Sequence, residues 1–144
     1  MHTEPAEHDD CFAIRQAARH ISQFYERHLS AADVTATQFS ILAALRHRAN
    51  LTMLELARAM VMDRTTLVRA LRPLLRNALV SDEADGQGPR RLQLVLTQHG
   101  RARLAAAMVH WRAAQKEFER KFGREQAACL RRELFRITRD VSKA

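Results

Sequence analysis

The chain has 144 residues, of which 47% are hydrophobic and 28% are charged, and its formal net charge is +8. This length suits one domain with a core large enough to fold alone. No segment approaches the ~20 consecutive apolar residues that a membrane-spanning helix requires, so we expect no membrane partner. The two cysteines, Cys11 and Cys129, are too few for a disulfide-stapled scaffold and lack zinc-finger spacing.

The motifs of metal-dependent and nucleotide-dependent enzymes are absent from the sequence. It contains no His-Glu-x-x-His or Cys-x-x-Cys pattern, and its four glycines form neither a phosphate-binding loop nor a dinucleotide fingerprint. His20 and His28 can share one face of a helix, but no third ligand is spaced to join them. We therefore expect no enzymatic activity, no metal and no cofactor.

The N-terminal third is predicted to be helical after a short polar tail. Residues 1–9 contain acidic side chains but no Lys or Arg, unlike a secretory or transit peptide, so we expect a disordered acidic tail and a cytoplasmic protein. From residue 10 to about 29, one stripe recurs with helical spacing: Ile14, Ala17, Ile21, Phe24 and His28. A capping box of Thr35 and Gln38 then begins a second helix that ends near residue 48.

The next segment has the pattern of two short helices joined by a tight turn. Thr52 followed by Glu55 is a second capping box, and Asp63 is the cap of the following helix. That helix has leucines on one side, and its other side carries arginine, threonine and valine: Arg64, Thr65, Val68, Arg69, Arg72 and Arg76. A helix with one apolar side and one basic side suits the major groove of DNA.

The early part of this helix is predicted to contact base edges. We expect Arg69 to form two hydrogen bonds with a guanine, and Thr65 and Val68 to touch thymine methyl groups. The other arginines are expected to hold the phosphate backbone: Arg64, Arg72 and Arg76. Residues 46–76 hold seven arginines against two acids, which favours double-stranded DNA as the partner.

A β-hairpin with a basic returning strand is predicted after the second helix. The first strand begins at residues 79–80, and residues 82–89 form a polar, turn-rich tip. Residues 92–96 alternate as a half-buried strand does. Arg90 and Arg91 precede this strand, where we expect them to enter the adjacent minor groove or to hold its phosphates.

Two more helices are predicted, and their apolar faces exceed what one copy of the chain can bury. Thr97 caps a long helix that runs to about residue 121, and Gly123 breaks it before a final helix. The final helix has an apolar seam with steps of three and four: Ala127, Leu130, Leu134, Ile137 and Val141. We expect a homodimer in which the first helix and the last two interlock about a two-fold axis, with half-sites ~34 Å apart on a pseudo-palindromic operator.

These elements, in this order, closely resemble the MarR family of bacterial transcriptional regulators over nearly the whole chain. The matching segments are residues 34–39, 54–57, 63–69, 79–80 and 96–100, together with Arg90. The resemblance implies one MarR-type domain at residues 10–144, mainly α-helical with a small β-hairpin wing. Its winged helix-turn-helix would occupy residues 35–100, and the dimerisation helices residues 10–29 and 101–144. The resemblance also implies that Thr66 contacts a phosphate or a base.

The function implied is that of a sequence-specific DNA-binding regulator, most often a repressor. The alternative is a winged-helix module for protein–protein contact, which the basic reading face argues against. The chain departs from the family pattern at several positions, among them Gly88, which stands where the family's wing often has Asp. Ala78 stands where the family usually has Gly before the wing, so we expect Asn77 to adopt the positive φ instead. Pro73 lies inside the reading helix and is expected to kink or tighten its C-terminal half.

The resemblance implies that a small molecule, often an aromatic acid or phenol, binds between the dimer helices and the reading motif and releases the DNA. In this chain the first, second and long helices would line that cleft. An Arg or His beside aromatic rings would hold an aromatic carboxylate there: Arg15, Arg19, His20, Phe24, Phe39 and Trp111.

An oxidant sensed by Cys11 is the other signal that the resemblance implies. Cys11-Phe12-Ala13 looks like the segment around the reactive cysteine of organic-hydroperoxide sensors in this family. A peroxide-oxidised Cys11 would be resolved by Cys129 of the other subunit. Those sensors carry tyrosines at positions that Ala36 and Phe39 occupy in this chain.

Overall fold

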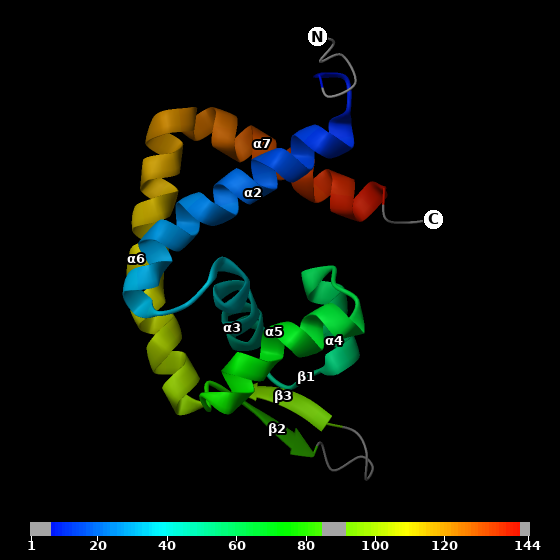
Figure 1. Ribbon diagram of the computed structural model, residues 1–144, viewed down its shortest axis with the longest axis vertical. Coiled ribbons are helices and arrows are strands. Elements are labelled where there is room, and N and C mark those ends of the chain that lie inside the picture. The colour runs from blue at the N-terminus through cyan, green and yellow to red at the C-terminus, as the bar shows by residue number, and fades with distance from the viewer. Residues whose placement is uncertain (1–6, 85–91, 142–144) are drawn as a thin grey trace.

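The computed structural model describes residues 7–84 and 92–141 (Figure 1). The elements follow one another as α2 (Asp10–Leu29), η1 (Ser30–Ala32), α3 (Ala36–His47), β1 (Leu51–Thr52), α4 (Met53–Met60), α5 (Arg64–Arg76), β2 (Val80–Ala84), β3 (Leu92–Leu96), α6 (Gln98–Phe122) and α7 (Arg124–Asp140). The long helix α6 joins two groups of elements: α2 and α7 at one end, and α3, α4, α5 and the sheet at the other (Figure 1). The predicted fold, mainly helical with a β-hairpin wing, is confirmed. None of the helices in the described ranges combines the length and hydropathy of a membrane span.

The helices begin where the sequence places their capping residues. Thr35 forms a complete capping box with Gln38, because each side chain accepts a hydrogen bond from the other's backbone N–H. Thr52 and Glu55 form the same arrangement at the start of α4. The carboxylate of Asp63 accepts from the backbone N–H three residues later at 2.7 Å, which fixes the first turn of α5.

A three-stranded antiparallel sheet closes one side of the helix-turn-helix, with the strand order β1-β3-β2. The hairpin of β2 and β3 was predicted, but β1 was not, because two residues carry no detectable alternation. The alternation predicted for residues 92–96 is wrong at one end. Leu94 and Leu96 are buried, whereas Leu92 is 52% exposed because it lies beyond the part of the sheet that the helices cover.

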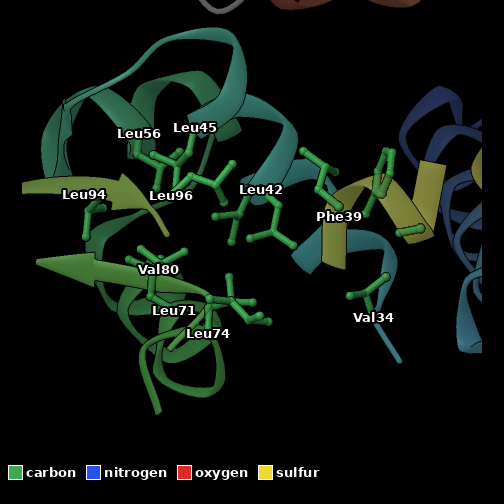
Figure 2. Close-up of a cluster of buried hydrophobic side chains, with 14 of the residues drawn as sticks. Val34, Phe39, Leu42, Leu45, Leu56, Leu71, Leu74, Val80, Leu94 and Leu96 are labelled. Carbon is green, nitrogen blue, oxygen red and sulfur yellow. The ribbon is translucent and has the colours of Figure 1, made fainter. Parts of the chain in front are cut away.

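The hydrophobic core lies between α3, α4, α5 and the inner face of the sheet (Figure 2). Leucines from every one of these helices meet there and are at most 2% exposed: Leu42, Leu45, Leu56, Leu67, Leu71 and Leu74. Burying each such side chain contributes about 1.5–3 kcal/mol. The core therefore fixes the inner side of α5 and leaves its outer side free.

The end of α5 differs from the sequence prediction by one residue. Asn77, with φ −90°, is the helix cap, and Ala78 adopts the left-handed conformation with φ 57°. The backbone N–H of Ala78 donates to the carbonyl of Leu75, and that of Leu79 donates to the carbonyl of Leu74. This pair of bonds is the Schellman motif, which requires the positive φ one residue after the cap. Helix α5 continues through Pro73 to Arg76, and the backbone N–H of Asn77 donates to the carbonyl of Pro73.

Helix α6 is tied at its start to the end of α5. The Thr97 hydroxyl donates to the carbonyl of Ala78 at 2.6 Å. A Cβ at Gly100 would lie 2.0 Å from the carbonyl oxygen of Leu79, so this close approach requires glycine. Helix α6 then packs against α3 and α2 and ends at Gly123, whose φ of 107° breaks the helix as predicted.

The helices at the far end carry apolar side chains that one copy of the chain leaves exposed. Ala127 is the buried member of the seam predicted on α7. The other four seam residues are 40–72% exposed: Leu130, Leu134, Ile137 and Val141. Ile14 and Ile21 on α2 are exposed as well.

Candidate nucleic-acid interface

The outer face of α5 presents the side chains predicted to read DNA. Leu67, Leu71 and Leu74 anchor the inner face in the core. Most predicted contact residues are exposed on the other side: Arg64, Thr65, Thr66, Arg69, Arg72 and Arg76. Val68 is half-buried on the same helix. One rigid helix therefore brings these residues together on a surface that a groove can approach.

The guanidinium groups of the α5 arginines have no ion-pair partner among the described residues. Within the described ranges, Arg64, Arg69, Arg72 and Arg76 form no ion pair. The carboxylate of Asp63 is the nearest acid in sequence, and it serves as the helix cap. Its pKa is lowered, first by the hydrogen bonds from Thr66 and then by the positive charge of Arg69. The cap is thus ionised at neutral pH, and the arginines remain available to phosphate and base acceptors.

An ion pair that no sequence pattern indicates orients α4 relative to α3. The guanidinium of Arg48 donates to the carboxylate of Glu55 at 3.1 Å. The same Glu55 closes the capping box of α4 with its other oxygen. Both residues are partly exposed, so the pair contributes more to the orientation of α4 than to stability.

The structure describes the two strands of the wing, β2 and β3. Arg90 and Arg91, predicted to contact the minor groove, lie outside the described residues. Between the strands and the first turns of α4 and α5 lies a hollow of about 390 Å³. Seven residues line it: Thr52, Met53, Leu54, Arg64, Asp82, Leu92 and Leu94. Arg64 is thereby placed at the junction of the reading helix and the wing.

The residues predicted to line an effector pocket lie on α2, α3 and α6, in different surroundings. Phe39 and Trp111 stack, with ring centroids 5.7 Å apart and an interplanar angle of 13°, and Phe39 is buried. Arg19 and His20 lie on the exposed side of α2, in a separate hollow of about 280 Å³. Phe24 packs against His28 on the same helix, and Arg15 is exposed.

A different cavity of about 380 Å³ lies between α2, α6 and α7. Its walls are mostly aromatic and aliphatic, and Trp111 is the predicted residue among them. Three groups give it a polar side: the Tyr25 hydroxyl, which donates to the Gln115 side chain, the Gln115 amide, and Arg131. Burial raises the pKa of Tyr25, so its hydroxyl stays protonated as a donor. No sequence pattern pointed to Arg131, because it is brought to Trp111 only by the turn at Gly123.

Another hollow, of about 760 Å³, lies between the turn that joins α4 to α5 and the C-terminal part of α7. Leu54 and Val61 give it an apolar wall, and Thr138 reaches it from α7. Both cysteines are exposed: Cys11 in the first turn of α2, and Cys129 on α7.

Comparison with known proteins places this geometry among transcriptional regulators. The model of the MarR family matches residues 34–86. The crystal structure of the transcriptional regulator MosR from M. tuberculosis is 33% identical, with a TM-score of 0.83, over 96% of this chain and 99% of MosR. A second MosR structure, in complex with DNA, is similar over 94% of this chain and 99% of that one, with 33% identity and a TM-score of 0.78.

Two more distant relatives agree with this comparison. The HTH-type transcriptional regulator SarZ of Staphylococcus haemolyticus is 26% identical over 90 residues, which are 62% of this chain and 61% of SarZ. The aligned part thus spans less than two thirds of that relative. The transcriptional repressor CouR, in a structure with p-coumaroyl-CoA, is 21% identical with a TM-score of 0.86 over 97% of this chain and 99% of its own. At this level of identity, the similarity to CouR shows only that the two chains share a fold.

Proposed function

Because the chain belongs to the MarR family of transcriptional regulators, we propose that it is a homodimeric repressor that binds a pseudo-palindromic operator. Helix α5 enters the major groove, and the wing lies against the adjacent minor groove. The observation that carries this proposal is the outer face of α5, where four arginines are exposed and form no ion pair within the described ranges. The DNA complex of MosR, at 33% identity, supports it.

The residues of this face divide into those that contact bases and those that contact phosphates. Thr65, Val68 and Arg69 read base edges, since they stand in the first half of the helix. The other side chains hold phosphates and set the register: Arg64, Thr66, Arg72 and Arg76. Arg90 and Arg91 of the wing complete the contact from the neighbouring groove.

The experiment that tests this function is fluorescence anisotropy of the purified protein with its own upstream intergenic DNA and with a scrambled duplex. At near-physiological salt we expect a preference of ~10³ or more for the operator. Affinity should fall with salt at a log–log slope of ~0.9 per phosphate contacted. Weak and equal binding to operator candidates from the whole genome would instead favour the winged-helix module for protein contacts.

The dimer is proposed to form through α2, α6 and α7. The exposed apolar seam of α7 and the exposed isoleucines of α2 are too extensive for a chain that acts alone. A second copy related by a two-fold axis covers the same surface on both subunits. It also places the two α5 helices about one turn of DNA apart, ~34 Å.

We propose that an aromatic acid or phenol releases the protein from DNA. The residues named for it from the sequence lie around α2 and its contacts: Arg15, Arg19, His20, Phe24, Phe39 and Trp111. The cavity between α2, α6 and α7 adds a site in which Trp111 stacks on a ring and Arg131 holds a carboxylate.

Salicylate and 4-hydroxybenzoate are suitable probes for this effector site. Since Trp111 is the single tryptophan, its fluorescence should change on binding, and operator affinity should fall in parallel. Arg131→Ala should abolish both changes, whereas Arg132→Ala, which removes the neighbouring charge outside the cavity, should not. If neither acid changed the fluorescence, an aromatic acid in this cavity would be contradicted.

Peroxide sensing by Cys11, with Cys129 of the other subunit as the resolving thiol, is the second candidate for the signal. The exposure of both thiols favours it, because an oxidant can reach them. Peroxide should then weaken operator binding, and Cys11→Ser should remove that response. A full response in Cys11→Ser would end this candidate.

A further inference from the structure

The hairpin carries a carboxylate on its inner side. Between β2 and β3, Val80 pairs with Leu96 and Asp82 pairs with Leu94. Directly paired residues and alternate residues of a strand share one face of a sheet. Asp82 therefore stands on the same face as Val80, Leu94 and Leu96, all of which are buried in the core. Unlike them, it is exposed, and it lies on β2, which is an edge strand of the sheet.

This face opens into the hollow of about 390 Å³ at the first turns of α4 and α5. Among its lining residues Arg64 is the one base and Asp82 the one acid. Both are exposed, and they form no ion pair at 4 Å or less within the described ranges. The remaining walls come from Thr52, Met53, Leu54, Leu92 and Leu94, which carry no charge. A group that enters this hollow thus meets one positive and one negative side chain.

We propose that Asp82 limits the affinity of the protein for any DNA duplex because it competes with the phosphates for Arg64; this inference rests on the DNA-binding function proposed above. A phosphate contact made by Arg64 is independent of sequence. A carboxylate in the same hollow repels that phosphate and attracts the guanidinium. Binding to random DNA is therefore weakened. Because this phosphate contact is made on any sequence, Asp82 lowers the affinity for operator and random duplexes by a similar factor.

Asp82→Asn tests this competition with a 30-bp duplex of random sequence over a range of salt concentrations. We expect the variant to bind this duplex about threefold to tenfold more tightly than the unaltered protein. Its salt dependence should be steeper by about one phosphate, a slope change of ~0.9. The matched control is Asp140→Asn, which removes the same charge on α7, where Asp140 pairs with Arg139 at 3.3 Å. An equal gain in both variants would show only the change in net charge and would overturn the proposal.

A double-mutant cycle with Arg64→Gln locates the effect. If Asp82 acts through Arg64, Asp82→Asn should no longer tighten binding once Arg64 is replaced. The same gain in both backgrounds would overturn the competition. Measurements on the unaltered protein distinguish a failure of the proposed DNA-binding function from a failure of this inference alone. If the unaltered protein binds neither the random duplex nor its own upstream DNA at low salt, the proposed function and this inference are both contradicted. If it binds with a steep salt dependence and Asp82→Asn has no effect, this inference alone falls.

Discussion

Arg69 stands on the first half of the exposed face of α5, with no ion pair in the described part of the chain. A bidentate contact from this position to a guanine would discriminate one base pair. Arg69→Ala should therefore cost ~1–3 kcal/mol on the operator and relax the preference at one position. Anisotropy titrations on the operator and on single-base variants measure both effects. Arg132→Ala on α7 removes the same charge as a control, and an equal loss on random DNA would contradict base reading by Arg69.

Ala78 holds the left-handed conformation that ends α5, with φ 57° and an exposed side chain. This conformation costs free energy for a residue with a Cβ, but not for glycine. Ala78→Gly should raise the free energy of unfolding by about 1 kcal/mol, as measured by urea denaturation. The opposite sign is expected for Ala105→Gly, at an exposed position inside α6, which should lower it by ~0.5–1 kcal/mol. A loss of stability in both variants would show that Ala78 is not strained.

At the scale of elements, a polar cluster joins the end of α2 to α6. Nε2 of His28 lies 2.9 Å from one carboxylate oxygen of Glu117, and Nζ of Lys121 lies 3.1 Å from the other. The ammonium group of Lys121 also lies over the ring of Phe24, 5.7 Å from its centroid. Lys121 first, and then His28, lowers the pKa of Glu117. The ionised form of Glu117 is thus the form that holds α2 against α6.

A carboxylate whose pKa is lowered on folding stabilises the chain at neutral pH, and that stabilisation is lost as the pH falls through the lowered pKa. Glu117→Gln should therefore lower the unfolding midpoint at pH 7. The difference from the unaltered protein should shrink as the pH falls below about 4.3, the ordinary pKa of a glutamate. Thermal unfolding followed by circular dichroism over this range checks the expectation. Glu125→Gln, at an exposed position of α7, is the control and should show a smaller difference; a constant difference for Glu117→Gln would refute the ionic contact.

At the scale of the whole molecule, the exposed seam of α7 should decide the oligomeric state. Ile137→Glu places a charge in this seam at a position that is 40% exposed in the single chain, so the subunit itself should still fold. We expect a shift from dimer to monomer in sedimentation velocity and a loss of operator affinity of more than tenfold, because one reading helix contacts one half-site only. Arg132→Glu, on the opposite side of α7, should leave the dimer intact. A dimeric Ile137→Glu would place the interface elsewhere.

Much of the fold and of the reading surface could be predicted from the sequence because the signals are local. A capping residue acts within one turn, so Thr35, Thr52 and Asp63 placed the starts of α3, α4 and α5 correctly. Helical spacing of leucines likewise separated the inner and outer sides of α5. The left-handed residue after α5 was misplaced by one position, because the last turn of a helix is set by the two carbonyls that the following residues can reach.

Only the tertiary structure decided which distant side chains share a space. Strand β1 exists because β3 offers it a partner, and its two residues alone have no strand signal. Trp111 and Phe39 stack because α6 packs on α3, whereas Arg19 and His20 line a separate hollow on α2. The meeting of Asp82 and Arg64 in one hollow follows from the register of the hairpin. Helix starts and helix faces depend on residues that are close in sequence, whereas these contacts depend on how the helices and strands pack against one another.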